Sequence, residues 1–337
     1  MKTFEHGGQI EKFAFDLGCK VSEVIDLSSN INFIKPQINI DFNTLDISSY
    51  PTYDKLYEKI ASNYGVETSQ IELFNGGSSA IFTLFKHLAL ETCTIYSPAY
   101  LEYKKASLNF GYELNTINRF ENIKEDVKEN SLVIFVNPST PDGKYYDVEE
   151  LMQTWIKKSC TILIDESFLD FCDKPSAIKY LKTYDKLYIL KSMTKFYSSA
   201  GIRVGTIVST KENIEKLKEF EPMWKLSLFD SNYLQAALDD KLFKNLSKEI
   251  NLKNKIELEN ILKNSSLVEE ISESSANYLL VKLKNLSAKE FQELLKPYKI
   301  MVRDCSNFDY LNSSHVRIAV KSSSANETLQ KALKEIC

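Results

Sequence analysis

Residues 186–205 read KLYILKSMTKFYSSAGIRVG and place one lysine, Lys195, between two apolar segments. The first segment, 187–190, is typical of a short buried strand; Ser192 follows it, and Arg203 comes eight residues after the lysine. Hydroxyls and a guanidinium suit a phosphate, because the guanidinium forks onto its oxygens and keeps its proton. A lysine held beside a phosphate indicates a Schiff base to a phosphorylated aldehyde. A hairpin with a solvated lysine is the alternative that this stretch alone leaves open.

The composition is that of an ordinary globular protein. Of the 337 residues, 43% are hydrophobic and 26% are charged, which allows a substantial core in one large or two moderate domains. The formal net charge of -4 disfavours nucleic acid as the main partner.

The six cysteines are scattered without a CxxC pair, so neither a metal site nor a disulfide framework is expected. No apolar run approaches the length of a membrane span, and the opening MKTFEHGGQIEKF lacks the apolar segment of a secretion signal. We therefore expect a cytoplasmic protein that does not bind a membrane.

Short apolar segments alternate with helical patterns from residue 71 onward. Strands that are apolar on both sides, separated by helices, indicate a mostly parallel sheet covered on both faces. The predicted fold class is α/β, a three-layer mostly parallel sheet with a smaller α+β domain. The predicted strands of this sheet are 71–74, 94–96, 132–136, 161–164, 187–190 and 206–209, and the helices among them include 53–64, 80–89 and 148–157.

The pattern changes near residue 211 to long amphipathic helices rich in Lys and Glu, followed by strands without the earlier alternation. We expect three parts. Residues 1–40 form an N-terminal arm that joins the small domain, residues 41–225 the large α/β domain, and residues 226–337 the small α+β domain.

Polar residues follow the predicted strands repeatedly, and ligands of open α/β sheets gather at the carboxyl ends of the strands. Residues 75–79 open a helix, where free N–H groups favour a phosphate, although an ordinary helix cap would have the same sequence. Asp165 ends a buried strand, where a carboxylate needs a cationic partner. A protonated pyridine nitrogen is one such partner, and a helix cap or a loop salt bridge is the alternative. Tyr100 either stacks on such a ring or packs in the core.

These motifs and their spacing resemble the fold-type-I pyridoxal-phosphate enzymes, and the resemblance covers most of the chain. It is carried by 76–79, 137–143, Asp165, the Ser192-x-x-Lys195 motif and Arg203. The resemblance implies that Lys195 forms the Schiff base with pyridoxal 5′-phosphate and that Asp165 pairs with the pyridine nitrogen.

The resemblance also implies a homodimer, in which Tyr50 reaches the phosphate bound by the neighbouring subunit. Lys191 is a second lysine near the motif, but it lies within the strand and at the wrong distance from Arg203. The cofactor-binding residues implied are Gly77, Ser78, Ser79, Tyr100, Thr140, Asp165, Ser192, Thr194, Lys195, Arg203 and Tyr50.

Two positions depart from the family pattern. Thr140 stands where the family usually has an asparagine that bonds the phenolic oxygen of the cofactor, so a shorter hydroxyl would take that role. Phe168 stands where many aminotransferases place a tyrosine for the same oxygen, and a phenylalanine cannot donate that bond.

Within this superfamily the sequence resembles the branch of histidinol-phosphate aminotransferase and threonine-phosphate decarboxylase, and more closely the decarboxylase. The segments that carry this likeness are 6–8 (HGG), 29–32 (SNIN), 165–171 (DESFLDF) and 194–197 (TKFY). The substrate-binding residues implied by the resemblance are His6, Asn30, Asn32, Arg303 and Arg317.

The predicted function is α-decarboxylation of a phosphorylated L-amino acid, L-threonine phosphate or L-serine phosphate, to the amino-alcohol phosphate. An aminotransferase of the histidinol-phosphate type is the alternative within the same fold. A non-catalytic protein that keeps this fold but has lost the cofactor is a third possibility, supported only by the departures from the family pattern at Thr140 and Phe168.

Overall fold

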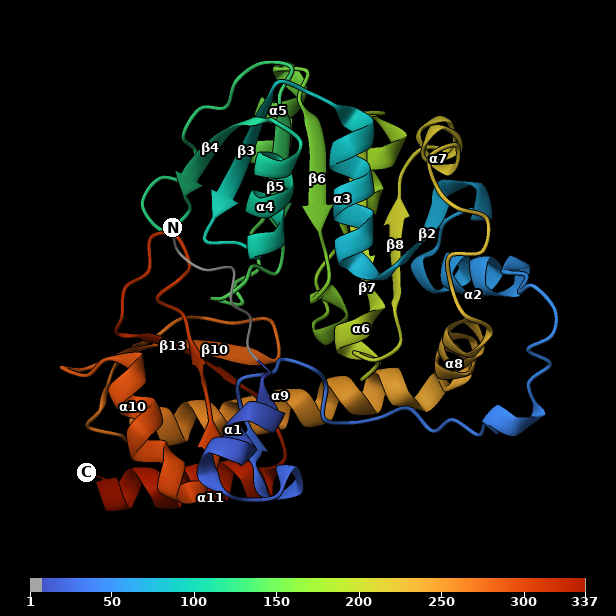
Figure 1. Ribbon diagram of the computed structural model, residues 1–337. Coiled ribbons are helices and arrows are strands. Elements are labelled where there is room, and N and C mark those ends of the chain that lie inside the picture. Colours follow the sequence, from blue (N-terminus) through green and yellow to red (C-terminus); the bar gives the residue numbers. More distant parts are fainter. Residues whose placement is uncertain (1–7, 337) are drawn as a thin grey trace.

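A seven-stranded sheet forms the centre of the computed structural model, which describes residues 8–336 (Figure 1). Its strand order is β2-β8-β7-β6-β5-β3-β4; β8 is antiparallel to both of its neighbours, and the other pairings are parallel. This arrangement confirms the predicted mostly parallel sheet. The strands are β2 (Ile71–Asn75), β3 (Thr92–Ser97), β4 (Glu113–Asn118), β5 (Leu132–Val136), β6 (Thr161–Asp165), β7 (Leu187–Ser192) and β8 (Val204–Val208).

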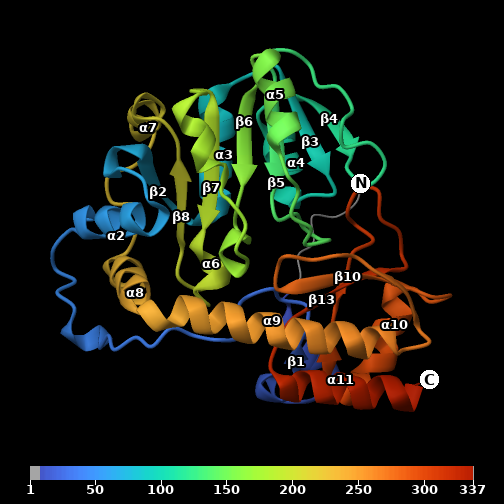
Figure 2. The same ribbon diagram turned by 180° about the vertical axis from the view of Figure 1, so that it is seen from behind.

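Helices cover both faces of the sheet and complete three layers (Figures 1 and 2). Neighbouring strand residues alternate between two cores: Ile162 packs with the helices of one face and Leu163 with those of the other. This is the pattern of strands buried on both sides. The helices of one face are α3 (Gly76–Leu88), α4 (Leu101–Asn109) and α7 (Lys211–Lys218). Those of the other face are α2 (Asp54–Tyr64), α5 (Glu149–Lys157) and α8 (Leu228–Asp239).

The C-terminal part of the chain has its own core around a four-stranded antiparallel sheet of order β12-β13-β10-β9. The long helix α9 (Lys241–Lys263) leads into it from the large sheet, as Figures 1 and 2 show. The remaining elements are β9 (Val268–Ile271), β10 (Tyr278–Leu283), α10 (Ala288–Leu295), β11 (Ile300–Met301), β12 (Arg303–Asp304), β13 (His315–Ala319) and α11 (Ser323–Ile336).

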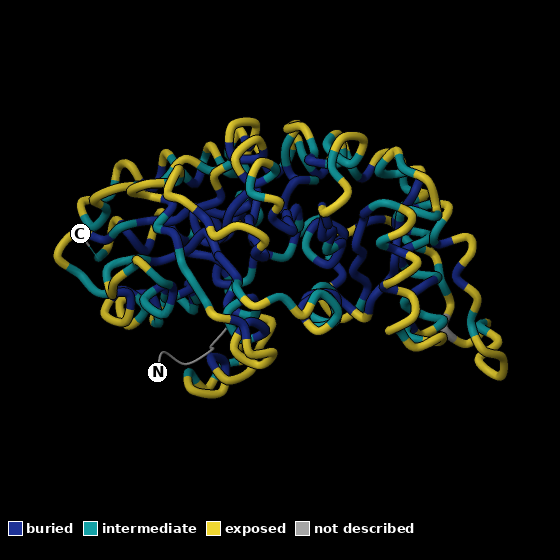
Figure 3. Tube along the Cα trace, turned by 90° about the horizontal axis from the view of Figure 1, so that it is seen from above, coloured by how far each residue is buried: buried dark blue, intermediate teal, exposed yellow. Residues whose placement is uncertain are grey.

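The N-terminal arm packs on this C-terminal part. After α1 (Ile10–Leu17), strand β1 (Ile25–Asp26) pairs in parallel with β11, and Leu27 lies fully buried in the C-terminal core. The burial view in Figure 3 shows buried segments in both halves of the molecule. Residues 28–32 then cross from the C-terminal part to the carboxyl edge of the large sheet, where the backbone N–H of Asn32 donates to the carbonyl of Lys195.

Some elements were not predicted from the sequence, namely β4, β9, α4, α8 and α11. β4 reads ELNTIN, a largely polar edge strand with few apolar residues to mark it. The segment with the candidate lysine is also not a simple loop, because Met193–Phe196 form a short helix, α6, directly after β7. None of the helices in the described part of the chain is both long and apolar enough to cross a bilayer.

Candidate active site

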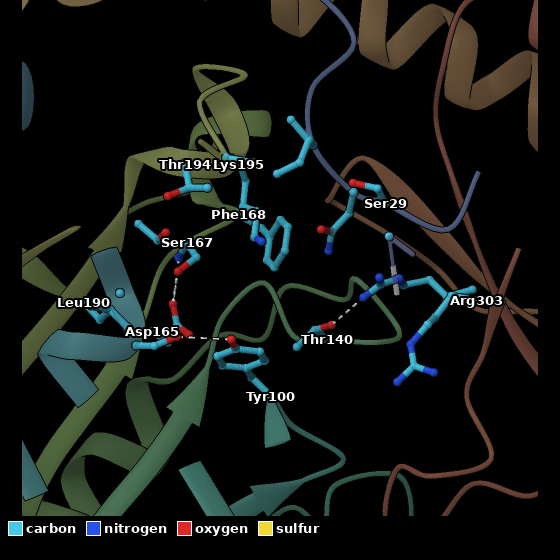
Figure 4. A pocket seen from close by; sticks show the side chains of 18 of the residues that line it. Ser29, Tyr100, Thr140, Asp165, Ser167, Phe168, Leu190, Thr194, Lys195 and Arg303 are labelled. Carbon is cyan, nitrogen blue, oxygen red and sulfur yellow. Dashed lines mark hydrogen bonds between the residues drawn. The ribbon is translucent and has the colours of Figure 1, made fainter. Parts of the chain in front are cut away.

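A cavity of about 360 Å³ lies between the carboxyl edge of the large sheet, the arm and the C-terminal sheet. Figure 4 shows Lys195 and Asp165 on one side of it and Arg303 on the other. Most of the predicted site residues meet here although they come from distant parts of the chain. Those that line the cavity are Asn30, Gly77, Ser78, Tyr100, Thr140, Asp165, Ser192, Thr194, Lys195, Arg203, Arg303 and Arg317.

Lys195 projects into the cavity from α6, and protein surrounds it on the other sides. The loss of hydration lowers the pKa of its ammonium group to about 8, and the positive charges of Arg317 and Arg203 act in the same direction. Asp165 opposes this shift. With this pKa about a tenth of the amine is unprotonated and nucleophilic at pH 7, a fraction roughly two orders of magnitude above that of an ordinary lysine.

Asp165 lies at the end of β6 with 4% of its surface exposed. Burial raises the pKa of this carboxyl group, whereas hydrogen bonds to the carboxylate act to lower it. Oδ1 accepts bonds from the backbone N–H (2.9 Å) and the hydroxyl of Ser167, and Oδ2 accepts one from the hydroxyl of Tyr103 at 2.8 Å. The carboxylate is thus held in place with one edge toward the cavity, where a cation could pair with it.

Tyr103 is a residue that the sequence analysis missed. It is fully buried on α4, and its ring meets that of Tyr100 edge to face at 6.3 Å between centroids. Tyr100 itself lines the cavity, and its hydroxyl lies 3.2 Å from the Ser78 hydroxyl. Because residues three apart share one face of a helix, a predicted α4 would have placed both tyrosines on the same face.

Glycines allow the first turn of α3 to pack closely against β8 and the side chain of Arg203 beneath the cavity. Gly76 has φ +80°, and a Cβ there would overlap the guanidinium of Arg203. A Cβ on Gly205 of β8 would lie 2.7 Å from the backbone nitrogen of Gly77. The first turn of α3 is therefore packed against β8 with its free N–H groups beside Arg203, which is a favourable site for a phosphate.

The hydroxyl of Thr194 provides an independent sign of a polar ligand. Its Oγ1 is buried at the cavity and has no hydrogen-bond partner in the described part of the chain. Since a buried hydroxyl without a partner is unfavourable, a bound group that accepts or donates a bond here would satisfy it.

The two arginines reach the cavity from one face of the C-terminal sheet. Arg303 of β12 and Arg317 of β13 are direct partners in the antiparallel register, so their side chains project from the same face. Arg317 donates to the Thr140 hydroxyl at 3.3 Å and to the carbonyl of Ser28 at 3.1 Å. Both arginine residues are at least nine-tenths buried.

Asn32 was predicted to bind substrate, whereas the structure shows its side chain bonded within the protein. It does not line the cavity; its side-chain amide donates to the Phe196 carbonyl at 2.8 Å and to the hydroxyl of Ser247. Its backbone N–H donates to the carbonyl of Lys195 at 3.0 Å. Asn32 thus ties the arm to the lysine-bearing segment and to α9, and it has no donor left for a substrate.

The other predicted positions lie as follows. Ser79 is one position further along α3 than Ser78 and does not line the cavity. Tyr50 is 73% exposed and does not line the cavity of its own chain; its ring stacks on that of Trp224 with 4.0 Å between the centroids. Lys191 is buried in an ion pair with Glu166 and does not line the cavity, which agrees with its dismissal. His6 falls outside the residues that the structure describes.

A sequence model of the aminotransferase class I and II family matches residues 23–336. The chain belongs to this family. The threonine-phosphate decarboxylase of Salmonella typhimurium is 25% identical over 351 residues, which cover 98% of this chain and 96% of that protein. The histidinol-phosphate aminotransferase of Methanocaldococcus jannaschii is 26% identical over 360 residues, covering 100% of this chain and 95% of that protein. The crystal structure of histidinol-phosphate aminotransferase from Clostridium acetobutylicum is similar with a TM-score of 0.83 and 28% identity, covering 93% of this chain and 99% of that one.

The cofactor of this aminotransferase family is pyridoxal 5′-phosphate, and the cavity residues fit it. The first turn of α3, Arg203 and the unpartnered Thr194 hydroxyl suit the phosphate. Lys195 supplies an amine of lowered pKa for the aldehyde, and the buried carboxylate of Asp165 suits the ring nitrogen. The role of Thr140 at the phenolic oxygen stays a prediction, although its hydroxyl faces the cavity.

The pKa of Lys195 predicts how cofactor uptake by the apoprotein depends on pH. Only the unprotonated amine attacks the aldehyde, so below pH 8 the rate of uptake should rise about tenfold per pH unit. It should level off above about pH 8, as stopped-flow absorbance would show. A rate that keeps rising to about pH 10 would indicate an ordinary solvated lysine instead.

Tyr103→Phe should weaken cofactor binding about tenfold, because a hydrogen bond to a buried charged group is lost. The matched control is Tyr112→Phe, since Tyr112 is buried in the same core but donates to the carbonyl of Phe85 at 2.7 Å, away from Asp165. Absorbance titration of each apoprotein with pyridoxal phosphate gives the dissociation constants. Equal affinities for the two variants would contradict a positioning role for Tyr103.

Proposed function

We propose that the protein is an α-decarboxylase of a phosphorylated L-amino acid, O-phospho-L-threonine or O-phospho-L-serine, and yields the amino-alcohol phosphate. The observation that carries the proposal is the pair of arginines, Arg303 and Arg317, side by side on one face across the cavity from Lys195. Two guanidinium groups that line one cavity suit a ligand with two anionic groups, and such a substrate has a carboxylate and a phosphate.

The chain's own residues divide the work of this reaction. When bound, the cofactor supplies an electron sink for the electron pair that carbon dioxide leaves behind. Lys195 offers an amine that exchanges with the substrate amine and later returns a proton to the substrate α-carbon. Asp165 holds a negative charge at the floor of the cavity, and Arg303 and Arg317 orient the two anionic groups. Phe168 lines the same cavity and gives it an apolar wall.

The aminotransferase of the histidinol-phosphate type is the second candidate, because relatives of both names match almost the whole chain at similar identity. The two reactions differ in which bond at the substrate α-carbon is broken, and the orientation of the carboxylate by the arginines decides this. A protein without cofactor chemistry is disfavoured, since Lys195 and Asp165 are both in the cavity.

We further propose that the active protein is a homodimer whose interface includes Tyr50. Tyr50 and Trp224 stack on the surface, and Met223 beside them is 75% exposed. Ile47 and Phe220 are also more than half exposed. Exposed large apolar side chains that lie near Tyr50 or Trp224 in the sequence support a protein contact there, and such a contact would let Tyr50 reach the site of the other subunit.

The reaction is tested by incubating the holoenzyme with O-phospho-L-threonine or O-phospho-L-serine in the absence of any keto acid. We expect release of carbon dioxide and the amino-alcohol phosphate. L-Threonine is the control; without the phosphate contacts it should react about 100-fold more slowly. Turnover only when 2-oxoglutarate is added would contradict decarboxylation and support the aminotransferase.

A further inference from the structure

The loop that joins β12 to β13, residues 305–314, connects the C-terminal part to the large sheet. Lys104 of α4 donates to both carboxylate oxygens of Asp309, at 2.8 and 2.9 Å. The hydroxyl of Tyr310 lies 2.7 Å from that of Thr116 on β4 and donates to the Thr116 carbonyl at 3.2 Å. Figures 1 and 2 show this loop reaching up from the C-terminal part to the end of β4.

The same loop holds the side chain of Arg303. Asn307 accepts a hydrogen bond from the Arg303 guanidinium at 2.9 Å. The ring of Phe308 lies 5.5 Å from the guanidinium carbon, and Phe308 itself is 5% exposed and lines the cavity. Phe308 packs in turn against Leu280 and Cys305 in a small core beneath the loop.

The strand that carries Arg303 is short and lies at the edge of the C-terminal sheet. β12 has two residues, and within the described part of the chain it pairs in that sheet with β13 alone. The C-terminal part lines one side of the cavity, and the large sheet lines the opposite side. Contacts that tie the Arg303 loop to α4 and β4 therefore fix Arg303 with respect to Lys195 and Asp165 on the large sheet.

We propose that Asn307 positions Arg303 for a substrate anion, and that the Lys104–Asp309 ion pair and the Tyr310–Thr116 contact set its distance from Lys195. This inference rests on the proposed function in so far as Arg303 binds an anionic group of the substrate. The side chains of Lys104 and Asp309 are 33% and 26% exposed, so the ion pair contributes little to global stability. Its effect is thus expected in substrate affinity rather than in folding or cofactor binding.

Kinetics of the holoenzyme with O-phospho-L-serine test the positioning role. Lys104→Asp and Asp309→Lys should each raise KM about tenfold, with kcat changed less than about twofold, because substrate binding rather than chemistry is affected. The double variant Lys104→Asp/Asp309→Lys restores the ion pair in reverse and should return KM to within about threefold of the parent value. Asn307→Ala should raise KM in the same way, and the cofactor dissociation constant should stay unchanged in every variant.

The matched control is Lys128→Asp, which breaks the 2.7 Å ion pair to Glu113 on the same strand β4 without touching the loop. It should leave KM unchanged. If the control raises KM as much as Lys104→Asp does, or if the double variant stays as impaired as the single variants, the proposed positioning role is wrong.

Hydrogen–deuterium exchange of the holoenzyme without substrate separates this inference from the proposed function. Amides of residues 303–312 should exchange at least about fivefold faster in Lys104→Asp and Asp309→Lys than in the parent and in Lys128→Asp. If the parent does not bind O-phospho-L-serine but exchange follows this order, the proposed substrate is wrong, whereas the role of the Lys104–Asp309 ion pair in holding the loop is supported. If exchange is the same in all variants, the ion pair does not hold the loop and the inference is refuted.

Discussion

Burial of one carboxylate, that of Asp165, is the interaction on which the rest of the site depends. An ionised group at the end of a central strand is costly unless other groups compensate for the lost water. Ser167 and Tyr103 supply hydrogen bonds to both of its oxygens, and Lys195 contributes a favourable charge. The side of the Asp165 carboxylate that faces the cavity can still pair with a cation, and the protonated ring nitrogen of the family's cofactor is such a cation.

The shape of the sheet brings the other groups to this carboxylate. Strands β2, β3, β5, β6 and β7 run in one direction, so their carboxyl ends deliver phosphate-binding, stacking and nucleophilic residues to a single edge. The glycines at 76, 77 and 205 let the first turn of α3 pack against β8 closely enough to place Arg203 beside it. The arm and the C-terminal sheet then close the cavity and add the two arginines.

Much of this arrangement is predictable from the sequence. The alternation of short apolar segments and helices predicts the sheet, and the polar residues after each segment predict the edge at which Asp165 and Lys195 meet. Tyr103 was missed because α4 has an unclear apolar pattern, and its role depends on a contact across 62 positions. The contacts of Asn32 could not be predicted for a related reason: a motif near a site does not tell whether an amide faces a ligand or, as here, the Phe196 carbonyl. Asn307 and Asp309 could not be found either, because the loop that carries them acquires its role only through contacts with another part of the chain.

We infer that Lys195, rather than the nearby Lys191, carries the cofactor, on the same side of the cavity as Asp165. The direct measurement is borohydride reduction of the holoenzyme, followed by proteolysis and tandem mass spectrometry of the segment 186–205. The buried ion pair of Lys191 with Glu166 and the position of Lys195 in the cavity predict a pyridoxyl group on Lys195 alone. A pyridoxyl group on Lys191, or none on this segment, would contradict the claim.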